Sequence, residues 1–275
     1  MSLRFGIAGV PRTSARPLTV HGIRRVRELG LDCMEMGWVN GVRMNDATAD
    51  RIARAALEHG IALTAHAPYF VNLCGNRTIA ARSVRRLVDT GRLAARCGAH
   101  SFCFHAGFYQ RQKPGRARQR VASQLKRVAR RLRAERVPVD IRPELTGRPS
   151  QLGSLEELLR WSRGIAGVAP CIDFAHHVAR HAGAHRRYDD FMALLMRIEA
   201  RLGRAALERL HVHMTGIEYG PSGERRHVPL RDSMFDHRDV LRALKDARVS
   251  GWVVCESPGR EDDALILQRA YRRMR

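Results

Sequence analysis

Short apolar runs alternate with longer segments of helical periodicity along the whole chain. Each run is rich in β-branched and other apolar residues, whereas apolar residues recur every three to four positions in the segments between them. The predicted strands are Arg4–Gly9, Cys33–Trp38, Ala62–His66, Ser101–His105, Val137–Glu144, Ala169–Asp173, Leu210–Met214 and Trp252–Glu256. The predicted helices are Thr19–Leu29, Ala47–His59, Ala80–Cys97, Ala117–Glu135, Leu155–Arg163, Tyr188–Leu202, Ser233–Ala247 and Glu261–Met274. Gly30, Gly60 and Gly98 each follow such a segment closely, as helix-ending glycines do.

This succession of strands and helices predicts a (β/α)8 TIM barrel, which typically needs about 250 residues. An open doubly wound sheet is the alternative, but the sequence has neither GxGxxG after its first strand nor GxxxxGK followed by Ser or Thr. No low-complexity linker divides the chain, so residues 1–275 are predicted to form a single α/β domain. The longest irregular stretch is expected over Thr215–Asp232.

Composition narrows the class of protein. A hydrophobic fraction of 44% in 275 residues excludes a wholly disordered chain. No apolar run approaches the roughly 18–20 residues that a membrane helix needs, and the N-terminal segment MSLRFGIAGVPR lacks the apolar stretch of a secretory signal. The six cysteines form no CxxC pair, which argues against a disulfide framework or a zinc ribbon. We therefore expect a cytoplasmic protein without a membrane partner.

Charge is the strongest global signal. Lys and Arg number 49 against 27 Asp and Glu, and the formal net charge is +22. Such an excess favours a polyanionic partner, although codon bias in a GC-rich genome can also load arginine onto a surface. The densest basic run is Arg111–Arg136. We expect Arg111, Lys113 and Arg116 at its start to reach a nucleic acid and the later arginines to form a solvated helix face.

Residues that bind metals follow the predicted strands at their carboxyl ends, which meet on one face of a barrel. They are His66, His105, Glu144, Asp173 with His176 and His177, His211 with His213, and Glu256. A single histidine at such a position is commonly structural, but carboxylates beside apolar strands are costly unless they are paired or bind a metal. Imidazoles and carboxylates together are the ligand set of zinc and manganese.

The pattern therefore predicts a multinuclear metal site. Two divalent ions about 3.5–4 Å apart can bind a phosphate and stabilise the oxygens of a displacement reaction. Glu144, on the central strand of the series, is the expected bridging carboxylate. The cysteines are not expected to be ligands, because none shares the strand-end spacing.

Six short motifs carry a resemblance to a known family. They are HAPYFVNL (66–73), FHAGF (104–108), PELTG (143–147), CIDFAH (171–176), LHVHMTG (210–216) and CESP (255–258). In this order they resemble endonuclease IV, a family of zinc-dependent abasic-site endonucleases among the xylose-isomerase-like barrels. The resemblance extends over nearly the whole chain.

The resemblance implies three zinc ions, although two ions, or manganese in place of zinc, stay open. It assigns His66 and His105 to the first ion, Glu144 as the bridge, and Asp173, His211 and Glu256 to the second ion, with His176 and His227 at the third. Glu144, Asp173 and Glu256 would then be catalytic. The family has an aspartate two residues before the last histidine, where this chain has Arg225, and the adjacent Glu224 is the possible substitute. His213 and His177 are either further ligands or donors that orient a ligand.

The resemblance also implies the substrate, a DNA duplex cut 5′ to an abasic site by a monomeric enzyme. Tyr69 matches the aromatic residue that fills the gap left by the missing base, and Phe70 follows it as a second wedge. Tyr69 and Phe70 could alternatively only cover the barrel rim. Asn40 and Arg43, after the second strand, are expected to contact the backbone or the gap, and Arg111 the phosphates.

Two other functions are compatible with the barrel. A mononuclear sugar isomerase or epimerase of the same superfamily would need only Glu144, Asp173, His211 and Glu256. It would leave the four histidines at 66, 105, 176 and 227 without a metal and the net charge of +22 without a polyanion. A non-catalytic nucleic-acid binder with a degraded site is disfavoured, because all six principal ligand positions are filled.

Overall fold

Eight parallel strands form the central sheet of the computed structural model, which describes residues 3–38 and 41–274. In sequence order they are β1 (Leu3–Ala8), β2 (Cys33–Gly37), β3 (Ala62–His66), β4 (Ala99–Phe104), β5 (Asp140–Pro143), β6 (Cys171–Asp173), β7 (Leu210–Met214) and β10 (Gly251–Cys255). Their order in the sheet is β5-β4-β3-β2-β1-β10-β7-β6. Isolated parallel bridges from Ile141 to Val168 and from Glu144 to Cys171 join the two outer strands. The sheet therefore curves into a nearly closed barrel, as the sequence predicts.

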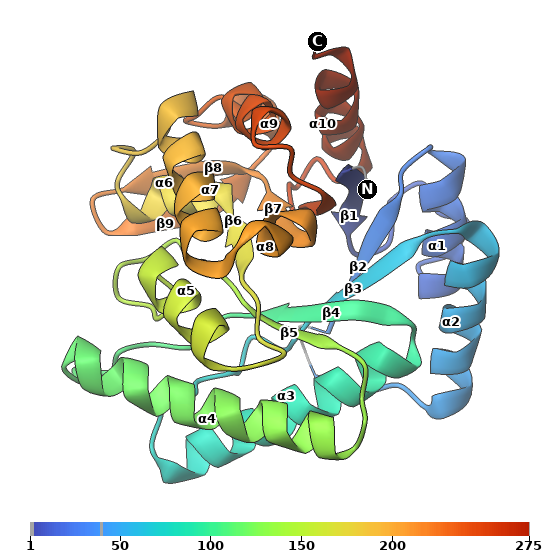
Figure 1. Ribbon diagram of the computed structural model, residues 1–275. Coiled ribbons are helices and arrows are strands. Elements are labelled where there is room, and N and C mark those ends of the chain that lie inside the picture. Colours follow the sequence, from blue (N-terminus) through green and yellow to red (C-terminus); the bar gives the residue numbers. More distant parts are fainter. Residues whose placement is uncertain (1–2, 39–40, 275) are drawn as a thin grey trace.

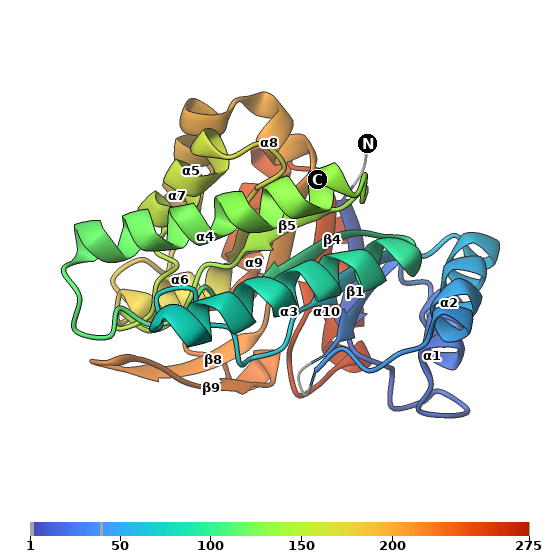
Figure 2. The same cartoon turned by 90° about the horizontal axis from the view of Figure 1, so that it is seen from below.

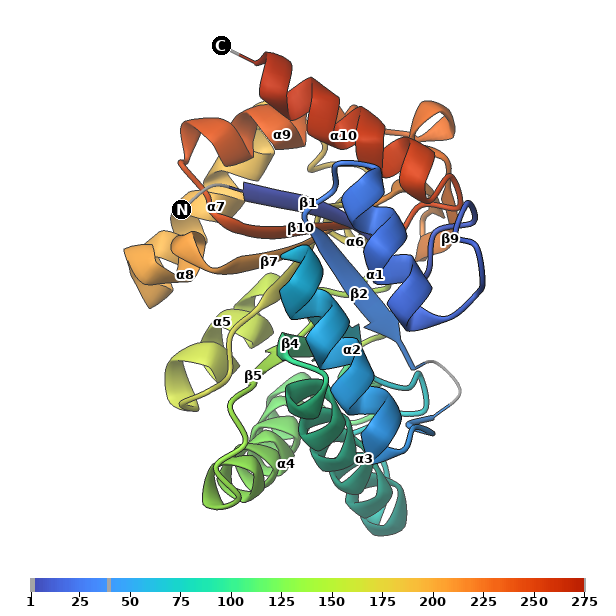
Figure 3. The same ribbon diagram turned by 90° about the vertical axis from the view of Figure 1, so that its right-hand side faces the viewer.

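Helices surround this barrel on its outside (Figures 1 and 3). The larger ones are α1 (Thr19–Glu28), α2 (Asp46–His59), α3 (Arg77–Arg96), α4 (Pro114–Ala134), α5 (Leu155–Gly164), α7 (Tyr188–Leu202), α9 (His237–Asp246) and α10 (Glu261–Arg273). The two longest, α3 and α4, lie side by side (Figure 2). The described residues contain no helix long and apolar enough to cross a membrane.

Two hydrophobic clusters stabilise the fold. The large one lies between the strands and the helices and includes the fully buried Phe102, Leu125 and Trp161. The small one comprises Cys33, Ala62, Trp252 and Val254, which alternate along their strands with members of the large cluster. Because strand side chains alternate between faces, the small cluster fills the barrel interior. The four residues occupy more than one level, since Trp252 and Val254 are two residues apart on β10, and His211 and His213 of β7 share these levels.

Local signals explain where the helices begin and end. Asn45 and Asn76 accept hydrogen bonds from Thr48 N and Ile79 N and cap α2 and α3. Gly30, Gly60 and Gly98 have φ values of 73°, 64° and 79°. The expected role of these glycines is confirmed, since left-handed backbone after a helix favours glycine.

The segment expected to be irregular contains regular structure. Within 215–232 the chain forms an antiparallel hairpin, β8 (Gly216–Gly220) and β9 (Gly223–Val228), and the turn of 3-10 helix η1 (Leu230–Asp232). Two short helices, α6 (Phe174–Arg180) and α8 (Arg204–Glu208), were also not predicted. The predicted strand from Val137 begins only at Asp140, because Pro138 has no backbone N–H to donate to a neighbouring strand.

Candidate metal centre

The ligand-type side chains come from the carboxyl ends of different strands. His66 and Asp173 are the last residues of β3 and β6, and Glu144 follows β5 directly. His105 and Glu256 follow β4 and β10 in the same way. Because all eight strands are parallel, these ends meet at one rim of the barrel.

Glu144 lies at the centre of this rim and is fully buried. Its Oε2 is 3.3 Å from the Nε2 atoms of both His66 and His105. Its Oε1 is 3.2 Å from His176 Nδ1 and 3.3 Å from His213 Nδ1. Four imidazoles from four segments of the chain therefore converge on a single carboxylate.

Positive charge around the carboxylates offsets the effect of burial. Burial raises the pKa of Glu144, but the imidazoles of His105 and His213 outweigh it and hold that pKa well below its usual range. Burial lowers the pKa of His66, yet its contact with Glu144 prevails and raises the pKa to about 9. Burial raises the pKa of Asp173 to about 6, although His176 acts in the opposite direction. Positive charge beside Glu144, which divalent cations would equally supply, therefore stabilises its ionised form.

Several buried polar atoms at the rim fit a bound metal. Glu144 Oε1, Asp173 Oδ2 and His213 Nδ1 have no hydrogen-bond partner among the described residues. His213 Nδ1 nevertheless lies only 3.3 Å from Glu144 Oε1 and 3.5 Å from Glu256 Oε1. Close approach of nitrogen and oxygen atoms without hydrogen-bond geometry is the arrangement expected of ligands around a cation.

The rim residues form overlapping sets in which the ligand atoms all lie within 4.8 Å of one another. The sets are His66, Cys103 and Glu144; His105, Glu144 and His176; Glu144, Asp173, His213 and Glu256; and Asp173, His176 and His227. Glu144, Asp173 and His176 each belong to more than one set. Such sharing is the geometry of a multinuclear centre, because one side chain can bridge two ions.

One predicted ligand is in a different place. His213, and not His211, joins Glu144, Asp173 and Glu256. His211 lies deeper in the barrel, where its Nε2 is 3.1 Å from Glu35 Oε2. Both histidines point inward, since they are two residues apart on β7, and the strand rises about 6.6 Å between them. At the rim, His213 therefore occupies the place beside Glu144 that the resemblance assigns to His211.

The family pattern has an aspartate where this chain has Arg225, and a β-bulge in the β8–β9 hairpin accounts for the difference. Glu218 pairs with Arg226 and Tyr219 with Glu224, so Arg225 is an extra residue on β9. The extra residue turns Glu224 toward the same side as His227, three positions later. Glu224 Oε2 is 3.5 Å from His176 Nε2, and its Oε1 is 3.7 Å from His227 Nε2. The exposed Arg225 instead pairs with Glu218.

Gly147 makes room for this acidic side chain. A Cβ atom at Gly147 would lie 2.7 Å from both Cβ and Oε2 of Glu224 and 3.0 Å from His176 Cδ2. The backbone N–H of Glu224 also donates to the Gly147 carbonyl over 3.0 Å. The glycine of the PELTG motif thus lets the hairpin dock beside the rim, a constraint that the motif alone does not reveal.

Asp173 links the helix α6 to the site. Its Oδ1 accepts a 2.7 Å hydrogen bond from His176 N and caps the helix, which leaves Oδ2 toward the rim. The cap places His176 one turn into α6, with Nδ1 near Glu144 and Nε2 3.2 Å from His227 Nε2. His177 points elsewhere: its ring packs against His181 at 4.7 Å.

The expected DNA contacts lie at different places around the rim. Tyr69 and Phe70 follow β3 with relative exposures of 63% and 62%, and the ring of Tyr69 is 5.4 Å from that of His66. Arg43 and Arg111 are exposed, in the loops after β2 and β4. Asn40 lies outside the described residues.

A cavity of about 650 Å³ opens beside the metal ligands. Its wall includes Glu35, His66 and Glu256, together with Arg16 and Arg260. A lining that combines carboxylates and an imidazole with guanidinium groups suits a ligand that is anionic and binds cations. Glu35, on β2, was not predicted from the sequence, because it lies within a strand and not at its end.

The comparisons with known proteins agree with this architecture. Residues 23–275 match the family model described as xylose isomerase-like TIM barrel. The chain belongs to that family. An uncharacterised protein of Methanocaldococcus jannaschii, MJ0133, is 38% identical over 272 residues, which cover 98% of this chain and 97% of the relative.

Solved structures with a similar fold include an endonuclease IV and sugar epimerases. Endonuclease IV from Thermus thermophilus superposes with a TM-score of 0.76 at 19% identity, over 98% of this chain and 97% of its own. A D-tagatose 3-epimerase-like protein has a TM-score of 0.74 at 15% identity, over 98% and 96%. The 3-keto-D-glucoside 4-epimerase of E. coli has a TM-score of 0.71 at 15% identity, over 98% of this chain and 100% of its own. At these identities the likeness concerns the fold, and the site must decide between the activities.

Proposed function

We propose that this protein is a metal-dependent phosphodiesterase that cleaves double-stranded DNA on the 5′ side of abasic sites. The observation that carries the proposal is the sharing of the carboxylates Glu144 and Asp173 between neighbouring ligand sets. Shared ligands hold ions close together, as phosphodiesterases with two or more metals require. Bound divalent cations, zinc or manganese, would supply Lewis acidity toward the phosphate.

The proposed ligands fall into three positions. They are His66, His105 and Glu144 for the first; Glu144, Asp173, His213 and Glu256 for the second; and Asp173, His176, His227 and Glu224 for the third. Glu144 would be shared by the first two positions, and Asp173 and Glu256 would help to hold the second. These three acids are the proposed catalytic residues, because they would hold the ions that supply Lewis acidity toward the phosphate.

Side chains around the rim would hold the DNA. Tyr69 and Phe70 are aromatic, exposed and next to a rim ligand, which suits insertion into the gap of an abasic duplex. Arg43 and Arg111 are exposed cations that suit contacts with phosphates. The net charge of +22 favours association with a polyanion. We propose that the protein binds as a monomer.

A sugar epimerase is the second candidate, and one observation favours it. Glu144, Asp173, His213 and Glu256 alone form a complete four-ligand set for a single ion. The epimerase hypothesis gives no role to His105 and His227, which are both about one quarter exposed at their side chains and close to other ligands. These two histidines therefore separate the two functions.

A His227→Ala variant tests the choice. Wild-type protein with zinc or manganese is assayed for cleavage of an abasic duplex and for epimerisation of ketohexoses. The proposal predicts cleavage by the wild type and a strong loss of cleavage in His227→Ala. Epimerisation that survives in His227→Ala, without cleavage by either protein, would instead establish the epimerase. His59→Ala, a change at the C-terminal end of α2 on the face of the barrel opposite the rim, is the matched control.

A further inference from the structure

A polar layer lies in the barrel interior, one level beneath the rim. Glu35, Cys103, Cys171 and His211 are all fully buried there. Cys171 and His211 are register partners on β6 and β7, so they occupy the same level. Barrel interiors are normally filled by branched apolar side chains. Two thiols, an imidazole and a carboxylate at this depth need a partner that offsets their loss of hydration.

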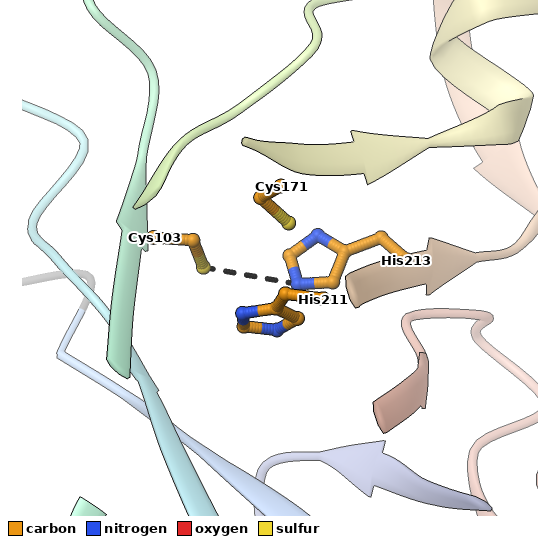
Figure 4. A group of neighbouring side chains, drawn as sticks. All are labelled: Cys103, Cys171, His211 and His213. Carbon is orange, nitrogen blue, oxygen red and sulfur yellow. Dashed lines mark hydrogen bonds between the residues drawn. The ribbon is translucent and has the colours of Figure 1, made fainter. Parts of the chain in front are cut away.

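The side chains of Cys103, Cys171, His211 and, from the rim, His213 point toward one another (Figure 4). The Sγ atoms of Cys103 and Cys171 and a ring nitrogen each of His211 and His213 all lie within 4.8 Å of one another. Cys103 Sγ is 3.7 Å from His213 Nε2. Zinc bonds of about 2.3 Å to sulfur and about 2.0 Å to nitrogen place tetrahedral S and N ligands roughly 3.5 Å apart. The distance between Cys103 Sγ and His213 Nε2 is therefore close to that between two ligands of one zinc ion.

Two buried atoms of this layer lack ordinary partners. His211 Nε2 and Glu35 Oε1 make no hydrogen bond with any described residue. His211 Nε2 is nevertheless 3.1 Å from Glu35 Oε2, and the other ring nitrogen of His211 contacts Ser101 Oγ at 3.3 Å. Ser101 thus fixes the orientation of the ring and turns Nε2 toward Glu35, in the way that an orienting partner of a metal ligand acts.

We propose that Cys103, Cys171, His211 and the Nε2 atom of His213 form an interior metal site for a thiolate-binding ion such as Zn²⁺. Two thiolates balance the charge of a divalent ion, which suits a fully buried position, and Glu35 places a further carboxylate 3.1 Å from His211 Nε2 and 3.2 Å from His213 Nε2. His213 also faces Glu144 and Glu256 through Nδ1, so with ions at both places its ring would bridge the interior site and the rim as an imidazolate. The interior site shares Cys103 and His213 with the rim sets, whereas Cys171 and His211 belong to none of them.

Cobalt substitution tests the site without any assay of activity. The metal-free full-length protein is titrated with Co²⁺, and thiolate-to-cobalt charge-transfer absorption in the near ultraviolet is recorded. The wild type should develop this band, and Cys171→Ser should lose it together with about one bound ion per chain. Cys33→Ser is the matched control, since Cys33 is an equally buried thiol that contacts only backbone carbonyls.

A second measurement covers the case in which Cys171→Ser does not fold. X-ray absorption at the zinc edge of the wild type loaded with zinc should detect sulfur at about 2.3 Å beside nitrogen and oxygen. A shell of nitrogen and oxygen alone, or an unchanged cobalt band and stoichiometry in folded Cys171→Ser, would overturn the proposal. Neither result depends on whether the protein cleaves DNA. The proposed interior site and the proposed endonuclease activity can therefore fail separately.

Discussion

Glu144 is the residue on which the rim depends most, because four imidazole nitrogens surround its carboxylate at 3.2–3.3 Å. We expect Glu144→Gln to retain the fold but to lose bound metal, since the amide removes the bridging negative charge. Abasic-site cleavage should fall by about 100-fold or more, as metal catalysis contributes several kcal/mol. Elemental analysis and the cleavage rate measure both effects. Glu135→Gln, which alters an ion pair with Arg92, is the control, and equal behaviour of the two variants would exclude the bridging role.

Glu224 and its neighbour Arg225 provide a matched pair at the third position. Glu224→Ala should lower the zinc content by about one ion per chain, because it removes an acidic group beside two histidines. Arg225→Ala should leave the zinc content unchanged, since Arg225 is exposed and pairs only with Glu218 among the described residues. Elemental analysis of the dialysed variants measures the zinc content of each. An effect of Arg225→Ala as large as that of Glu224→Ala would contradict the assignment.

At this scale the sequence predicts the residue types better than their depth. The residues that close the strands, such as His66 and Glu144, do meet at the rim, because parallel strands end on the same side. His211 and His213 could not be told apart, since residues two apart on a strand share a face and only the register with neighbouring strands fixes their level. Strand-end spacing excludes Cys103 and Cys171 as metal ligands, but this criterion applies to the rim and not to the layer beneath it.

Among the elements, the loop that follows β3 is the part we expect to recognise a damaged duplex. It presents the exposed rings of Tyr69 and Phe70 beside His66. Tyr69→Ala should weaken binding of an abasic duplex by about tenfold and binding of an intact duplex much less, since stacking on an aromatic ring is worth about 1–3 kcal/mol. Fluorescence anisotropy with both duplexes measures this difference. Equal losses would mean that Tyr69 only covers the rim, and Leu57→Ala, an exposed apolar residue of α2, is the control.

The hairpin β8–β9 supplies Glu224 and His227, and its bulge can be tested by deletion. Without Arg225, Glu224 would stand two positions before the histidine in a regular strand, and the two side chains would again share a face. The deletion variant should therefore keep its zinc content, in contrast to Glu224→Ala. Loss of an ion on deletion would show that the bulge itself positions Glu224.

The hairpin also shows where sequence reasoning at the level of elements ends. Its two strands, β8 and β9, contain glycine and charged residues and lack the apolar alternation of a buried strand. The Pro221-Ser222 turn between them was the available signal. The eight barrel strands, in contrast, are short apolar runs separated by helical periodicity, and that pattern was sufficient to predict the barrel.

The whole molecule combines a buried, acid-rich rim with a strongly basic surface. Some arginines are neutralised locally, as Arg96 is by Asp46 and Asp50. The excess of 49 basic over 27 acidic residues cannot be neutralised in this way, and it favours a polyanion large enough to extend beyond the rim. A small neutral sugar would not use this charge, which is why we expect duplex DNA as the substrate.

The most direct test of this account is cleavage of an end-labelled duplex that carries a single abasic-site analogue. The protein is loaded with zinc or manganese, and an intact duplex and a chelator-treated sample are run beside it. We predict a single cut on the 5′ side of the lesion, no cut in the intact duplex and no cut after chelation. Folded, metal-loaded protein that leaves the abasic duplex uncut would contradict the account.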